Sequence, residues 1–173
     1  MAESLGAPLP PPPDPVGRWL FHVSRGFAAL GGLVLVAITL MSVASIASRF
    51  LTSKGLQGDF ELVQLGCAVA VAAFLPWGQM RGSHVMVDFF TEGIGQRARN
   101  RLDALGALLL AICAAVVAWR MVIGTLELRA SQESSMLLGV PTWYATLLMT
   151  PSFALLALTA LYSARIKLQE RAP

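Results

Sequence analysis

The chain has 173 residues, of which 55% are hydrophobic and only 13% are charged. This balance excludes an ordinary soluble globular fold, in which about a quarter of the residues are charged, and the length suggests a single domain. The net charge is +3, from 13 Lys and Arg residues against 10 Asp and Glu residues. The basic residues are scattered near the ends of apolar runs, which indicates membrane orientation rather than nucleic-acid binding.

The first 17 residues contain six prolines and no basic residue. Because proline disrupts a helix interior, residues 1–17 are expected to be a disordered, polyproline-like tail. The absence of a basic n-region does not fit a secretory signal peptide. The folded domain is therefore expected to cover residues 18–168, with a short C-terminal tail at 169–173.

Residues 26–48 form an uncharged run of 23 residues and predict the first transmembrane helix. The run exceeds the roughly 7–15 residues of a signal-peptide h-region, so this helix should be retained. The spacing of Ala28 and Gly32, and of Ala44 and Ser48, is the small-xxx-small pattern that allows close approach of a second helix.

The second transmembrane helix is predicted at about residues 60–80, because residues 62–80 carry no charge. Beyond Arg81 the chain continues into a short amphipathic run with apolar side chains at helical spacing. This pattern predicts an interfacial helix over about residues 84–101 that lies along the membrane surface.

The third and fourth transmembrane helices are predicted at about residues 104–124 and 142–164. Arg120 is the only charged residue of the third, about 24 Å into a core about 30 Å thick, so its side chain should reach the near surface. Trp143 suits an interfacial position at the start of the fourth. The predicted fold class is an all-α integral membrane protein with four transmembrane helices plus the interfacial amphipathic helix.

The basic residues also predict the orientation of these helices. The predicted inner set is Arg18, Arg25, Arg81, Arg97, Arg99, Arg101, Arg165, Lys167 and Arg171, and the outer set is Arg49, Lys54, Arg120 and Arg129. Nine basic residues against four favour an N-in, C-in orientation by the positive-inside rule.

Catalytic motifs are missing from the sequence, which has no P-loop, no GxSxG and no HExxH. Cys67 and Cys113 lie in apolar runs and are expected to act as small packing residues. The central parts of the four predicted helices lack the charged groups that an independent carrier needs to bind a charged solute. We therefore expect neither an enzyme nor a stand-alone carrier.

Two charged pairs leave alternatives open. Arg49 and Glu61 lie at the outer ends of adjacent helices, where they either form a cross-helix ion pair or are separately solvated. His84 and Asp88 are four residues apart and share a face if their segment is helical. They either anchor this segment at the interface or contact a partner subunit.

Several positions resemble the small membrane subunit, the DctQ-like Q subunit, of tripartite ATP-independent periplasmic (TRAP) transporters. The matching positions are Arg49 and Phe50, Glu61 and Leu62, Pro76, residues 82–88 and residues 139–143. The candidate scaffold or partner contacts within this pattern are Arg49, Glu61, Pro76, His84, Asp88, Pro141 and Trp143.

The resemblance implies a scaffold subunit in the bacterial inner membrane, with both termini cytoplasmic. Its partners would be membrane lipids, a large transport subunit and a periplasmic binding protein that delivers an organic acid. Sodium would bind the large subunit, and no cofactor or metal is expected on this chain. The alternatives are a self-associating four-helix carrier, whose usual carboxylate in the first helix is missing here, and a membrane assembly factor.

Overall fold

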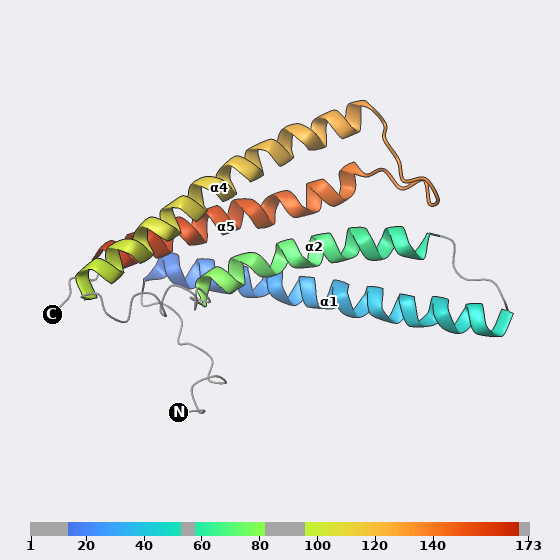
Figure 1. Ribbon diagram of the computed structural model, residues 1–173, viewed down its shortest axis with the longest axis horizontal. Helices are drawn as coiled ribbons and strands as arrows, with labels where there is room; N and C mark the ends of the chain where they lie inside the picture. Colours follow the sequence, from blue (N-terminus) through green and yellow to red (C-terminus); the bar gives the residue numbers. More distant parts are fainter. Residues whose placement is uncertain (1–13, 53–57, 82–95, 170–173) are drawn as a thin grey trace.

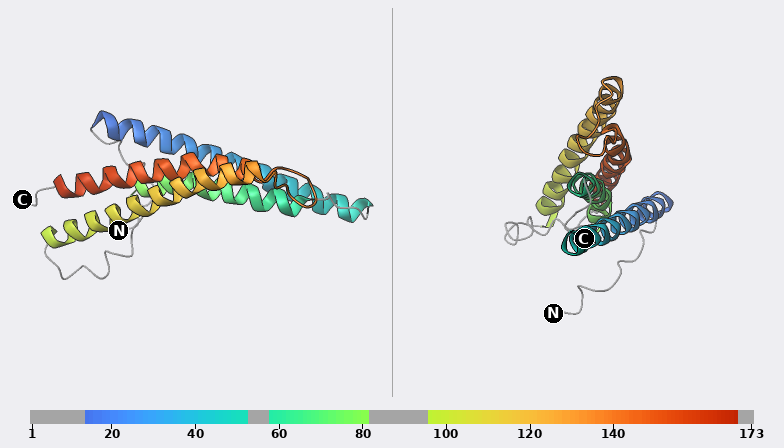
Figure 2. Two further views of the ribbon diagram at one scale, coloured as in Figure 1. Left: turned by 90° about the horizontal axis from the view of Figure 1, so that it is seen from above. Right: turned by 90° about the vertical axis from the view of Figure 1, so that its right-hand side faces the viewer.

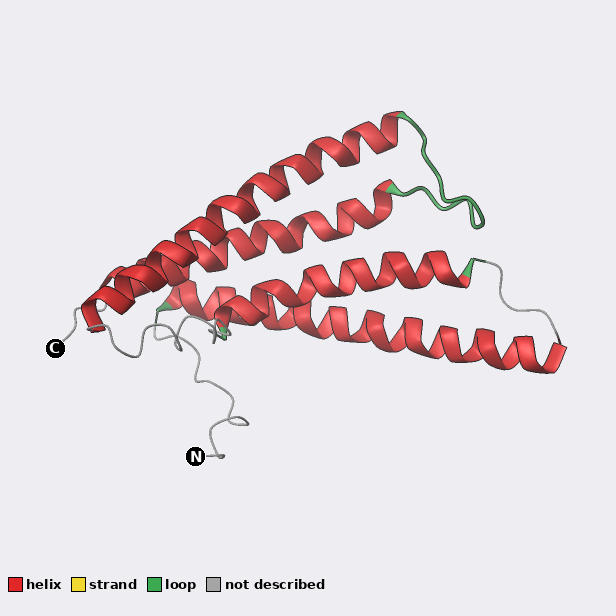
Figure 3. Ribbon diagram, in the orientation of Figure 1, coloured by secondary structure: helices red, strands yellow, loops and turns green. Residues whose placement is uncertain are grey.

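The computed structural model describes residues 14–52, 58–81 and 96–169. These residues form four helices, α1 (Pro15–Thr52), α2 (Asp59–Met80), α4 (Gln96–Ala130) and α5 (Trp143–Gln169). Within the described ranges the remaining segments are short loops and turns (Figure 3). Each helix is long and apolar enough to cross a membrane. The predicted all-α fold with four membrane-spanning helices is confirmed.

Two of the helices extend well beyond the predicted spans. α1 has 38 residues and α4 has 35, because a helix can continue past the hydrocarbon core into the polar region. α1 begins at Pro15, so the predicted tail boundary at residue 17 is three residues too late; proline is well suited to the first helical turn. Residues 96–101, predicted as the end of the interfacial helix, instead begin α4. Residues 84–95 of that prediction lie outside the described residues.

The four helices pack in the order α1, α2, α5, α4; α1 is antiparallel to α2 and α4 is antiparallel to α5, whereas the neighbours α2 and α5 run in the same direction (Figure 1). α1 packs mainly on α2, α4 packs on α5, and the α2–α5 contact joins the two antiparallel pairs. The end-on view in Figure 2 shows the same succession of helices. The helices therefore form an extended layer with α1 and α4 at its edges, rather than a bundle around one central core.

The contact between α4 and α5 is built from small residues. Ala104, Ala107, Ala111 and Ala114 are at most 8% exposed and recur at alternating intervals of three and four residues. This is the heptad spacing that keeps one seam of a helix facing an antiparallel neighbour. Alanine at the seam lets the two backbones approach closely, which is how helices commonly associate inside a membrane.

The contact between α1 and α2 depends on glycine and serine. Ser24, Gly31 and Ser45 are buried at intervals of seven or fourteen residues. A Cβ on Gly31 would lie only 3.1 Å from the backbone oxygen of Ala70 and from the Cβ of Ala73 on α2, so the helices touch here.

Gly32 and Ala44, two of the four small residues at small-xxx-small spacing, do not lie in the contact between α1 and α2. A Cβ on Gly32 would meet no atom within 4 Å, and Ala44 is exposed. The contact face follows a seven-residue repeat through the neighbouring positions Gly31 and Ser45. Gly32 and Ala44 are each one residue away from the contact positions Gly31 and Ser45, so the small-xxx-small spacing does not locate the contact face.

Aromatic and ionic contacts join the helices at the end of the layer where α1 begins and α5 ends. The Phe21 and Trp77 rings are 4.8 Å apart between centroids, and the Arg81 guanidinium lies 5.6 Å from the Trp77 ring centroid. Lys167 of α5 forms an ion pair with Asp103 of α4 at 3.6 Å. Both helix pairs are thus fastened at this end as well as along their seams.

Candidate functional site

The connection between α4 and α5 forms a small hairpin at the opposite end of the layer (Figure 1). Ser134 and Pro141 form an antiparallel bridge, and the Ser135 amide donates to the Val140 carbonyl at 2.9 Å. We call residues 131–142 the α4–α5 hairpin. Its backbone hydrogen bonds give it a defined shape with an apolar tip.

Glu61, in the first turn of α2, binds this hairpin. One carboxylate oxygen accepts from the Ser135 hydroxyl at 2.6 Å and from the Leu138 amide at 3.1 Å, and the other accepts from the Leu137 amide at 3.1 Å. In the part of the chain that the structure describes, no ion pair joins Glu61 to Arg49. Glu61 is thus neither ion-paired across helices nor separately solvated; it fastens the hairpin to α2.

Asp59, two residues before Glu61, fastens α2 to α1 instead. Its carboxylate accepts from the Ser45 hydroxyl at 2.6 Å and from the Phe60 amide at 2.8 Å. The positive charge of Arg49 also acts on Asp59. An acidic group is favourable in the first turn of a helix, where unpaired amides carry partial positive charge. The two carboxylates therefore connect α2 to α1 on one side and to the hairpin on the other.

Gly58 makes the approach of the hairpin to α2 possible. Its φ of +82° is a left-handed conformation that glycine adopts without steric cost. A Cβ at this position would lie 2.3 Å from Cγ of Leu138, so the hairpin packs directly over the glycine. Gly58 thus supplies both the turn before α2 and the space for Leu138.

The substitution Gly58→Ala is expected to loosen the hairpin and destabilise the protein. The left-handed backbone alone should cost about 1–2 kcal/mol for a residue with a Cβ, and the overlap with Leu138 adds to that cost. Thermal unfolding of the detergent-purified protein measures the effect. Adding Leu138→Ala to the variant should recover the part due to overlap, relative to Leu138→Ala alone. A double variant that recovers nothing would contradict the packing described.

Aromatic residues mark the start of α5. The Arg129 guanidinium lies 5.6 Å from the Trp143 ring centroid, and the Trp143 and Tyr144 rings stack with centroids 4.0 Å apart. Tryptophan and tyrosine favour the membrane–water interface, and the cation adds an attraction to the ring face. This cluster is suited to holding the α5 start, and with it the hairpin, at a fixed depth.

The structure distributes the seven candidate contact residues unequally. Arg49, Glu61, Pro141 and Trp143 lie at the hairpin end, whereas Pro76 is buried inside α2 toward the other end. His84 and Asp88 lie outside the described residues. The contact of all seven with a partner subunit stays a prediction.

Sequence reasoning misses Gly58 and Ser135, although both position the site. A glycine directly before an acidic helix start is a visible turn signal, but it does not indicate that residue 138 lies over it. Ser135 carries no sequence signal, because its role depends on a residue 74 positions away.

The contacts of Asp59 with α1 and of Glu61 with the α4–α5 hairpin form a structural joint. Among the described residues no group of three or more His, Cys, Asp or Glu could hold a metal ion. Cys67 and Cys113 are unpaired thiols on different helices. The carboxylates at the joint use their oxygens to fasten backbone elements together.

Comparison with known proteins places this geometry in context. The family model described as the DctQ component of tripartite ATP-independent periplasmic transporters matches residues 38–170, which include Asp59, Glu61 and the α4–α5 hairpin. No curated protein and no solved structure matches the chain.

Proposed function

Because the chain belongs to the DctQ component family of TRAP transporters, as the match over residues 38–170 shows, we propose that it is a small scaffold subunit. In this role it supports a large transport subunit in sodium-coupled uptake of an organic acid delivered by a periplasmic binding protein. The family match is the observation that carries the proposal. The large subunit and the binding protein are its proposed protein partners.

The surface of the helix layer supports a scaffold role. Leu33, Leu40 and Ile46 on α1 and Leu109 on α4 are each more than 60% exposed, so both edge helices present apolar side chains. Such surfaces suit lipid tails and the helices of another membrane protein. Residues 26–48 and 62–80 carry no charge that could hold an organic anion and a cation at membrane depth. We therefore assign the substrate and sodium sites to the large subunit.

Complex formation tests this role. When the chain is produced together with a tagged large subunit from the same transporter, both should elute as one complex in mild detergent. The extended layer leaves apolar faces that the partner would cover, so the complex should also unfold at a higher temperature than the isolated chain. A chain that elutes only with copies of itself would contradict the proposal and favour the small-carrier alternative.

We further propose that the protein lies in the bacterial inner membrane with both termini in the cytoplasm. The start of α1 and the end of α5 lie at the same end of the layer (Figure 1), and the basic residues favour that end as the inner side. In a background lacking Cys67 and Cys113, Gln132→Cys should react with an impermeant thiol reagent applied from the periplasm, and Gln96→Cys should not. The reverse labelling would overturn this orientation.

A further inference from the structure

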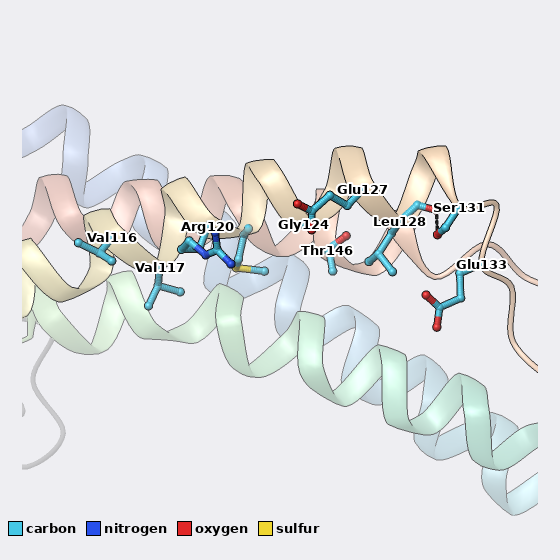
Figure 4. A pocket seen from close by; sticks show the side chains of 10 residues that line it. Val116, Val117, Arg120, Gly124, Glu127, Leu128, Ser131, Glu133 and Thr146 are labelled. Carbon is cyan, nitrogen blue, oxygen red and sulfur yellow. Dashed lines mark hydrogen bonds between the residues drawn. The ribbon is translucent and has the colours of Figure 1, made fainter.

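A groove of about 640 Å³ lies on α4 near its C-terminal half and is partly closed by α5 and the hairpin (Figure 4). We call it the Arg120 groove. From the middle of α4 toward the hairpin, its lining includes Val116 and Val117, Arg120, Gly124, Glu127 and Glu133. The groove is open to the outside of the helix layer, where lipid or a partner would meet it.

Arg120 gives the groove a charge inside a membrane-spanning helix. It lies ten residues before the end of α4, about 15 Å along the helix axis, and its side chain is exposed. It forms no ion pair within the described ranges of the chain. Because this side chain is expected to reach the level of the lipid head groups, an anion from outside the chain, such as a lipid phosphate, is expected to accompany the guanidinium.

The chemical character of the groove changes in a fixed order along α4. Val116 and Val117 make one end apolar, Arg120 follows, and the carboxylates of Glu127 and Glu133 lie toward the hairpin (Figure 4). The Glu127 carboxylate turns back toward Gly124 and Arg120 in this view. A phospholipid with an amino head group has the same order, from acyl chain to phosphate to ammonium.

Gly124 keeps the centre of the groove open. A Cβ added to this residue would meet no atom within 4 Å, so a side chain there would project into space that the protein does not otherwise fill. Gly124 lies one helical turn from Arg120 and just under one turn from Glu127. The space between the cation and the carboxylate is thus available to a ligand.

We propose that the Arg120 groove binds a zwitterionic phospholipid of the phosphatidylethanolamine type. The phosphate accepts hydrogen bonds from the Arg120 guanidinium, which suits phosphate geometry. The ammonium donates to Glu127, whose carboxylate turns toward Arg120 (Figure 4), and an acyl chain lies along Val116 and Val117. An anionic lipid, or a carboxylate of a protein partner, would satisfy Arg120 but bring no cation to Glu127. This inference does not depend on the transporter assignment.

Lipid titration of the purified full-length chain tests the groove. After delipidation in detergent, the protein is titrated with phosphatidylethanolamine or phosphatidylglycerol, and retained lipid is counted by native mass spectrometry. One phosphatidylethanolamine should be retained in preference to phosphatidylglycerol, and it should raise the unfolding temperature. Arg120→Gln should weaken this binding by about tenfold, because it removes the charge-assisted bonds to phosphate.

Three further variants test separately the role of the carboxylate charge, the role of the free space at Gly124 and any nonspecific effect of removing an arginine. Glu127→Gln should shift the preference toward phosphatidylglycerol, and Gly124→Leu should reduce binding of both lipids by filling the groove. Arg25→Gln removes an exposed arginine of α1 that lies outside the groove lining and should change neither. Circular dichroism checks that each variant keeps its helices.

Equal retention of the two lipids by the unmodified chain would overturn the proposal, as would unchanged retention by Arg120→Gln. If Arg120→Gln instead abolished binding to the large subunit in lipid-free detergent while phosphatidylethanolamine retention stayed the same, the occupant would be a protein group. That result would also overturn the lipid assignment.

Discussion

The substitution Gly31→Leu is expected to push α1 away from α2 and to destabilise the protein strongly. A Cβ at this position already lies 3.1 Å from the Ala70 backbone oxygen and from the Ala73 Cβ, and a backbone atom cannot yield as a flexible side chain can. Overpacking of a close contact typically costs about 1–3 kcal/mol. The three further carbons of leucine would clash with α2. Thermal unfolding in detergent should show a clear loss of stability.

The adjacent substitution Gly32→Leu is a matched control. It introduces the same side chain one residue further along α1, where a Cβ meets no atom within 4 Å. Leucine favours a helix over glycine by up to about 1 kcal/mol, so this variant should be as stable as the unmodified protein or slightly more stable. Equal destabilisation by the two substitutions, or a larger effect at Gly32, would contradict the helix contact described here.

The positions and order of the four membrane-spanning helices follow from the sequence, but their contact faces do not. In a soluble protein the buried face is apolar and the exposed face is polar, whereas a membrane helix is apolar on both. The informative signal is residue size: the seven-residue repeat through Ser24, Gly31 and Ser45 marks the seam of α1. The alanine series from Ala104 to Ala114 marks the seam of α4 in the same way.

Helix ends were harder to predict than helix spans for a related reason. Uncharged runs indicate where the hydrocarbon core begins and ends, but a helix continues as long as its own backbone hydrogen bonds are satisfied. α1 therefore reaches from Pro15 to Thr52, past Arg18, Arg25 and Arg49. Charged residues limit the part of such a helix that lies in the hydrocarbon core, but they do not determine where the helix itself ends.

The contacts of Glu61 at the hairpin end cannot be predicted from the spacing of residues in the sequence. Arg49 and Glu61 are near each other in sequence and opposite in charge, which suggests an ion pair. The hairpin instead brings the Ser135 hydroxyl and two backbone amides to Glu61. This outcome depends on the backbone of residues 134–141, whose turn at Gly139 has a φ of +64°.

Reconstituted uptake measures the proposed scaffold role most directly. Vesicles that contain this chain together with its large subunit, supplied with the binding protein and a sodium gradient, should accumulate the organic acid. Omitting this chain should reduce uptake to the background of empty vesicles, and the chain by itself should give no uptake, because its helices offer too few polar groups at membrane depth to hold a charged solute. Full uptake without the chain, or sodium-dependent uptake by the chain alone, would contradict the account.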